Sequence, residues 1–118
     1  MEIPGEVDNA EPLHRRIHPT FIRPDGRISS QAFTDPELSV DRGLYRDVAE
    51  TLMNRDGFGV AVFLARSARE LGQEVRADPQ LLNKAHALVV GKKTKSIARR
   101  LARSSQWKVE IDSTSKAH

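Results

Sequence analysis

The sequence predicts a small α+β domain, built on a small mixed sheet with two or three helices. Three observations support this prediction. Apolar runs of strand character recur along the chain, stretches of helical periodicity lie between them, and 118 residues suit one domain with one modest core. We place the domain at residues 13–112, between an acidic leader at 1–12 and a polar tail at 113–118, and we expect both ends to be flexible.

Short strands and turns are predicted for the first part of the domain. Pro19 and Pro24 exclude a continuous helix, and the Pro-Asp-Gly tripeptide that begins at Pro24 is a strong turn signal. The extended pieces that we expect cover residues 16–17, 21–22 and 27–33.

An amphipathic helix is predicted over residues 40–55. Apolar residues recur there at helical spacing and so lie on one side of the helix. They are Leu44, Val48, Leu52 and Met53. Ser39 or Asp41 can cap the start of this helix, and Asp56-Gly57 can end it.

Two apolar runs predict buried strands. The first, residues 59–65, precedes a short helix at 66–71 that Gly72 ends, although one longer helix fits the same run. The second, residues 85–90, is apolar enough for the centre of a sheet. A further short strand is expected at residues 74–77.

A strand–helix–strand unit closes the domain. It joins the strand at 85–90 to a helix that begins after Thr94 and to a strand at 107–111, and we expect the two strands to pair in parallel with a right-handed connection. At about 100° per residue, one side of the helix is apolar and the other is basic. The apolar side carries Ile97, Ala98, Leu101 and Ala102, and the basic side carries Lys95, Arg99, Arg100 and Arg103.

Positive charge is concentrated near the C-terminus. The chain has a net charge of +3, but residues 81–108 carry eight cations and no carboxylate, whereas residues 1–12 carry four acids. A segment of this kind attracts an anionic partner. We expect that partner to be a nucleic acid or another polyanion, although an acidic protein or the chain's own leader would satisfy the same cations.

The first candidate site is the connection between the strand at 85–90 and the helix after Thr94. Phosphate is favoured there because backbone N–H groups and the positive end of the helix dipole meet formal charge. The P-loop spacing is missing, since Gly91 stands alone, and a capped helix with solvated lysines explains the same residues. The predicted phosphate-binding residues are Lys92, Lys93, Thr94, Lys95, Arg99, Arg100 and Arg103.

Metal and thiol chemistry are not expected. The chain has no cysteine, which excludes disulfides, zinc ribbons and thiol catalysis. His14 and His18 stand four residues apart, but Pro19 argues against a helix and no acid lies between the two histidines. We expect neither a metal nor another cofactor.

An enzyme is the main alternative to a binding module. Arg15, Ser30 and Glu110 fall on or beside successive predicted strands, an arrangement that resembles ADP-ribosyltransferase-like folds, in which such residues hold a nicotinamide dinucleotide. The paired acid of arginine-modifying transferases is missing, since Lys108 stands two residues before Glu110. His86, on a predicted central strand, can act as an acid or base beside them. This alternative predicts that Arg15, Ser30, His86 and Glu110 share one pocket.

The phrases RISSQAF, ELSVDR and AHALVVGKKT resemble segments of short bacterial proteins that have no established activity. The resemblance implies a small bacterial protein and assigns no functional residue. No apolar run is long enough to span a bilayer, and the acidic start is unlike a signal peptide, so we expect a cytoplasmic protein with no membrane partner. The sequence thus favours a cytoplasmic binding module for nucleic acid, and a small subunit of a larger assembly is a third alternative.

Overall fold

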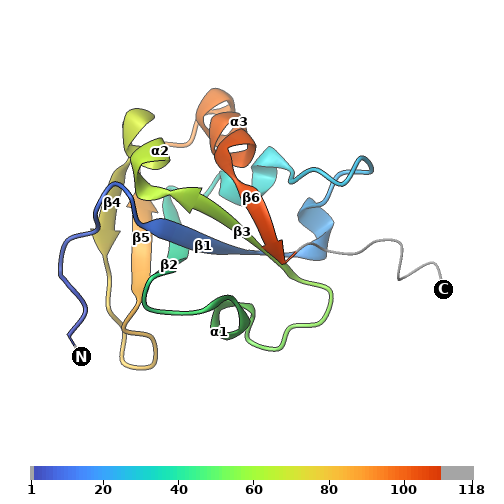
Figure 1. Ribbon diagram of the computed structural model, residues 1–118. Coiled ribbons are helices and arrows are strands. Elements are labelled where there is room, and N and C mark those ends of the chain that lie inside the picture. Colours follow the sequence, from blue (N-terminus) through green and yellow to red (C-terminus); the bar gives the residue numbers. More distant parts are fainter. Residues whose placement is uncertain (1, 110–118) are drawn as a thin grey trace.

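The computed structural model describes residues 2–109, in which six strands form one sheet in the order β4-β5-β2-β1-β3-β6 (Figure 1). The strands are β1 (Pro12–Ile17), β2 (Glu37–Arg42), β3 (Gly59–Leu64), β4 (Glu74–Ala77), β5 (His86–Val90) and β6 (Gln106–Val109). The helices are α1 (Val48–Leu52), α2 (Ala65–Glu70) and α3 (Lys95–Ser104), with two short 3-10 helices, η1 (Pro19–Phe21) and η2 (Ser30–Phe33).

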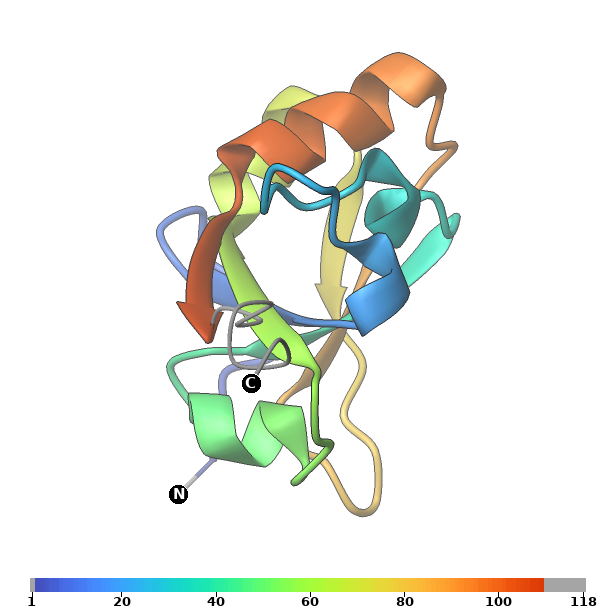
Figure 2. The same ribbon diagram turned by 90° about the vertical axis from the view of Figure 1, so that its right-hand side faces the viewer.

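Side chains alternate along the strands and give the sheet one apolar and one polar face. Leu13 and Ile17 of β1 are fully buried on the apolar face, and Phe33 of η2 meets Phe63 of β3 edge-on, with ring centroids 6.1 Å apart. On this side α2 and α3 pack against β3, and α3 also packs against η2. Figure 2 shows α1 on the opposite side of the sheet from α3, where it contacts β1 and β3.

The α+β class is confirmed, and several elements lie where the sequence predicts them. The strand at 59–64 with α2 behind it, the strands β4 and β5, and the helix after Thr94 are all present. Ala98 and Leu101 of α3 are buried in the core. The cationic side chains of α3 are exposed, as the helical wheel predicts, and they are Lys95, Arg99, Arg100 and Arg103.

The helix predicted over residues 40–55 is wrong. The first part of this stretch belongs to β2, in which Leu38 and Val40 point into the core, and only the five residues of α1 are helical. Asp47 starts α1 by accepting a hydrogen bond from the backbone of Glu50. Leu44, which the helical spacing places on the apolar stripe, is 62% exposed.

The strand expected at residues 27–33 is also wrong. Ser29 caps η2 instead, with its hydroxyl accepting from the backbone N–H of Gln31 at 3.2 Å. Ala32 and Phe33 are buried through this 3-10 turn. Local side-chain capping therefore prevails over the strand pattern.

The closing strand–helix–strand unit is present, but its two strands do not pair. Every pairing in the described sheet is antiparallel, in place of the parallel pairing that was expected here. β2, β1 and β3 lie between β5 and β6, so β5 and β6 run in the same direction without touching. The connection through α3 crosses the apolar face, which explains why α3 covers the core.

The acidic segment before β1 has no helix or strand, yet it packs onto the domain. Val7 is buried in the core, and Glu11 is buried beside Arg42. Arg42 also donates to the carbonyl oxygens of Pro4 and Glu6. The segment expected as a flexible leader thus contributes buried groups to the fold. The predicted tail and the end of the last predicted strand fall beyond residue 109 and lie outside the described residues.

Candidate polyanion-binding site

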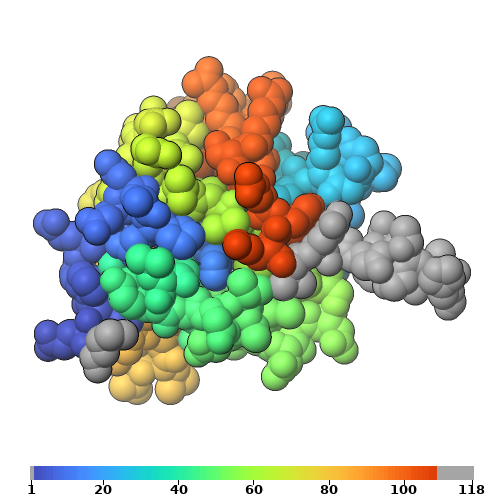
Figure 3. All heavy atoms as spheres, in the orientation of Figure 1, coloured from blue at the N-terminus to red at the C-terminus, as the bar shows by residue number. Residues whose placement is uncertain are grey.

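Four arginines from two distant parts of the chain line one hollow beside α3. Arg23 and Arg27 come from the loop before η2, and Arg99 and Arg103 come from α3. The hollow has a volume of about 520 Å³. Figure 3 shows the light-blue loop and the orange-to-red α3 and β6 side by side on the surface. We call this site, defined by Arg23, Arg27, Arg99 and Arg103, the arginine hollow.

A tight turn positions the two loop arginines. The backbone N–H of Arg23 donates to the carbonyl of Arg27 at 2.8 Å, and that of Gly26 donates to the carbonyl of Arg23 at 2.9 Å. Gly26 has a φ of +83°, a left-handed conformation that a side chain would strain. The predicted turn at Pro24-Asp25-Gly26 is therefore confirmed, and it sets Arg23 and Arg27 on either side of its tip.

The core packing of α3 positions the other two arginines. Thr94 caps the helix by accepting from the backbone N–H of Ile97 at 3.1 Å. Burial of Leu101 turns Arg99 and Arg103, one helical turn apart, toward the hollow. Trp107 of β6 joins the two walls, since its indole N–H donates to the carbonyl of Gly26 at 3.3 Å.

The arginine hollow carries a strong excess of positive charge. Among residues 2–109, Asp25 is the one carboxylate that lines it, and the Arg27 Nε to Asp25 Oδ2 distance is 3.6 Å between two exposed side chains. Within residues 2–109, no carboxylate lies within ion-pair distance of Arg23, Arg99 or Arg103. Exposed ion pairs of the Arg27–Asp25 kind are weak, so the hollow favours an external anion.

The acidic N-terminal segment does not supply that anion where the structure describes it. Glu11 is bound to Arg42, and the side chain of Asn9 accepts from Arg69 at 2.7 Å. These partners lie on β2 and α2 rather than on α3.

The predicted residues at the start of α3 take two different roles. The ammonium group of Lys93 donates to the carbonyl oxygens of Val89 at 3.0 Å, Gly91 at 2.9 Å and Pro36 at 3.4 Å. Three acceptors use its three N–H donors, so Lys93 holds the loop rather than an external phosphate. Burial lowers the pKa of Lys93, and nearby Asp35 opposes that shift. Thr94 is likewise engaged as the helix cap.

Lys92, just before α3, and Lys95, its first residue, remain exposed to solvent. Arg100 lines a neighbouring hollow of about 440 Å³, which Arg103 shares and which Glu70 of α2 also borders. Of the seven predicted phosphate-binding residues, the structure therefore brings Arg99 and Arg103 together with new partners. It does not gather all seven at one place.

The residues of the enzyme alternative do not share one pocket. Ser30 lines the arginine hollow, whereas Arg15 and His86 border a separate hollow. The guanidinium of Arg15 donates to the carbonyl oxygens of Ala32 and Ser39, at 3.3 and 2.9 Å. Glu110 lies outside the described residues.

Sequence reasoning did not assign a role to Arg23 and Arg27. The signal that could have found them is their position, because they bracket a strong turn and the nearest acid, Asp25, lies between them. Their approach to α3 depends on the sheet, since Gly26 and Trp107 are 81 residues apart in the chain.

Metal ligands do not converge in the described part of the chain. Residues 2–109 contain no cluster of three histidine or acidic side chains that could hold a metal ion. The same residues contain no helix long and apolar enough to cross a membrane. No protein-family model matches the chain, and no curated protein or solved structure is significantly similar to it.

Proposed function

We propose that the protein binds the phosphate backbone of a nucleic acid in the arginine hollow. The observation that carries this proposal is the convergence of four arginines around one concave surface, which in the described part of the chain one exposed acid, Asp25, also lines. Guanidinium groups match phosphate oxygens in geometry and can bind them with two parallel hydrogen bonds. Binding would release counterions from the nucleic acid and would weaken steeply with salt.

The surroundings of the hollow favour a polymer over a small anion. Lys95 and Arg100 continue the positive surface of α3 on both sides of Arg99 and are exposed. A strand of phosphates longer than the hollow would gain these contacts, whereas a single phosphate would not. The chain has six aromatic residues in all, and only Trp107 lines the hollow, so backbone contacts rather than base stacking would supply most of the affinity.

The test is fluorescence anisotropy with labelled duplex DNA, single-stranded DNA and RNA over a series of salt concentrations. We expect the double variant Arg99→Glu/Arg103→Glu to lose binding. For the wild-type protein on duplex DNA, the log–log salt slope should be about −0.9 for each phosphate neutralised, and Arg99→Gln/Arg103→Gln should flatten it by about 2. Arg23→Gln/Arg27→Gln should have a similar effect.

The matched control is Arg66→Glu/Arg76→Glu, which changes the net charge equally at two exposed positions outside the hollow. Equal loss of binding in both double variants would mean that net charge alone attracts the DNA, and it would overturn the assignment of the site. Binding to poly-glutamate but to none of the three nucleic acids would replace the proposed partner with an acidic protein.

A further inference from the structure

We infer that the polar face of the sheet carries a second binding site, for a small molecule that joins an oxyanion group to an apolar body. The site is a hollow of about 420 Å³ on the opposite side of the sheet from α3, within the range of small-molecule sites. Its functional residues are His14, Arg16, Asp41, Thr51, Met53 and Leu82. We call it the polar hollow, and it is independent of the arginine hollow.

Three adjacent strands build the floor of the polar hollow. His14 on β1 stands opposite Asp41 on β2, which stands opposite His86 on β5. Arg16 follows His14 by two residues and so points to the same face. The side chain of Arg15, between them, points to the apolar face, where it bonds to η2.

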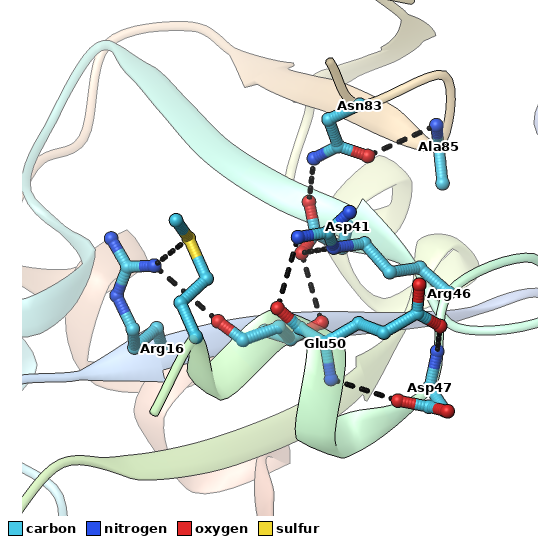
Figure 4. Close-up of polar contacts among 9 residues, drawn as sticks. Arg16, Asp41, Arg46, Asp47, Glu50, Asn83 and Ala85 are labelled. Atoms are coloured by element: carbon cyan, nitrogen blue, oxygen red, sulfur yellow. Dashed lines mark hydrogen bonds and ion pairs between the residues drawn. The ribbon is translucent and has the colours of Figure 1, made fainter. Parts of the chain in front are cut away.

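The acid in the floor is already satisfied by protein groups. One oxygen of Asp41 accepts from the hydroxyl of Thr51 at 2.8 Å and lies 3.1 Å from Nε of Arg46, and the other accepts from the amide of Asn83 at 2.7 Å (Figure 4). Arg46 also donates to the carbonyl of Glu50 at 2.9 Å. Because Asp41 is the one carboxylate among the described lining residues and is neutralised, this lining does not favour a cation.

Arg16 supplies a positive charge without a matching carboxylate. One terminal nitrogen of its guanidinium donates to the carbonyl of Thr51 at 3.3 Å and to the sulfur of Met53 at 3.0 Å, as Figure 4 shows. Within residues 2–109, no acid lies within ion-pair distance of it. Burial lowers the pKa of Arg16, and the charges of Arg55 and Arg46 add to this effect, while the charge of Asp41 opposes it. A half-buried guanidinium in this setting is completed by an anion.

His14 supplies a polar atom that the described protein leaves unsatisfied. The residue is 5% exposed, and its Nδ1 atom has no hydrogen-bond partner among residues 2–109. The ring lies against Gly43, where an added Cβ would come within 2.5 Å of Nε2, so the ring has little room to turn. Buried polar atoms usually have partners, so His14, which lines the hollow, places an unsatisfied polar group beside it.

Apolar side chains at the rim of the polar hollow can contact the apolar part of the ligand. The large apolar side chains that the described residues expose are Leu44, Met53, Leu81 and Leu82. Met53, 54% exposed, and Leu82, 93% exposed, line the polar hollow. A ligand whose oxyanion meets Arg16 at the floor would place its apolar part between these two side chains.

The experiment uses phenyl phosphate, benzoate, inorganic phosphate and phenol as probes, titrated into the full chain by calorimetry and by NMR of the His14 ring nitrogens. We expect phenyl phosphate or benzoate to bind with a Kd of about 1 mM or lower, and phenol to bind about tenfold more weakly. The preferred anion tells whether the oxyanion is a phosphate or a carboxylate. Arg16→Gln should weaken binding of the preferred anion by about tenfold.

Three further variants test the specificity of the result. Arg55→Gln removes a nearby arginine that does not line the hollow, and it should change the affinity by less than about twofold. Leu82→Ser, at a fully accessible position, should weaken the phenyl probes and leave inorganic phosphate unchanged. Arg99→Glu/Arg103→Glu should keep probe binding intact, so the two proposals fail separately. Equal affinity for phenol, full affinity in Arg16→Gln, or absence of binding by every probe would overturn the inference.

Discussion

Glu11 and Arg42 form a two-pronged ion pair inside the protein. Nε and Nη2 of Arg42 donate to the two carboxylate oxygens of Glu11, each at 2.9 Å, and the side chains are 4% and 1% exposed. The guanidinium of Arg42 also lies over the ring of Tyr45, with 5.0 Å to the centroid. Burial raises the pKa of Glu11, but the hydrogen bonds and charge of Arg42 outweigh burial and lower it below the ordinary 4.5.

This pair predicts that the N-terminal segment matters for stability. Glu11→Gln leaves the charge of Arg42 buried without a counter-charge, and we expect the free energy of unfolding to fall by about 3 kcal/mol. Urea unfolding followed by Trp107 fluorescence measures the change. Glu6→Gln alters an exposed acid of the same segment and should cost less than about 0.5 kcal/mol. Equal stabilities of the two variants would show that the leader does not stabilise the domain.

Removing the charge of Asp25 is expected to raise the affinity for a polyanion. Of the acids that the structure describes, Asp25 alone lines the arginine hollow, and it pairs with Arg27 at 3.6 Å. Asp25→Asn removes this charge while the amide oxygen can still accept from the backbone N–H of Arg27, as the carboxylate does at 3.0 Å. We expect nucleic-acid binding to tighten by about twofold at low salt, measured by anisotropy. The exposed Asp56→Asn is the control, and weaker binding by Asp25→Asn would contradict the proposed site.

Replacing Lys93 is expected to lower the stability of the fold, whereas the sequence alone predicts that it weakens phosphate binding. Its ammonium group holds three carbonyl oxygens at the loop that leads into α3. Lys93→Met should lower the free energy of unfolding by about 1–3 kcal/mol and leave the salt slope of nucleic-acid binding unchanged. Lys92→Met, at an exposed neighbour, should leave stability unchanged. A flatter salt slope for Lys93→Met would return this lysine to the binding surface.

Local sequence patterns correctly predicted the helices and strands whose structure depends mainly on residues close in the sequence. The apolar runs of β3 and β5 and the amphipathic spacing of α3 are such patterns, and they are confirmed. The helix expected at 40–55 is wrong because its first residues belong to β2, in which Leu38 and Val40 both face the core. This strand gains its hydrogen bonds from β1 and β5, which lie in distant parts of the chain. Strand order depends on such distant partners, so the pairing of β6 with β3 could not be read from local sequence.

In the candidate sites, too, features set by local sequence could be predicted and features set by distant contacts could not. The exposure of the α3 arginines could be predicted from the helical wheel. Arg23 and Arg27, which line the same hollow, are brought beside α3 by tertiary contacts that the local sequence does not show. Lys93 looks like a phosphate ligand in sequence because its carbonyl partners carry no side-chain signature. The polar hollow was missed because His14, Asp41 and Asn83 come from three separate segments, and only the sheet and the β4–β5 loop bring them together.

His14 predicts a loss of stability in mild acid. Burial lowers the pKa of its imidazole below the ordinary 6.5, and Lys108 acts in the same direction, while Asp41 and Asp47 oppose the shift. The unfolded chain therefore binds more protons than the folded chain near pH 6.5 and below, until the folded pKa is reached. By linkage, the contribution of His14 to stability is present above 6.5 and decreases as the pH falls through this window.

The variant His14→Gln isolates this contribution because its side chain does not titrate. We expect urea unfolding to show a smaller loss of stability between about pH 7 and pH 5 in His14→Gln than in the wild-type protein. Wild-type pH dependence in His14→Gln would mean that protonation of the buried ring does not lower the stability of the fold.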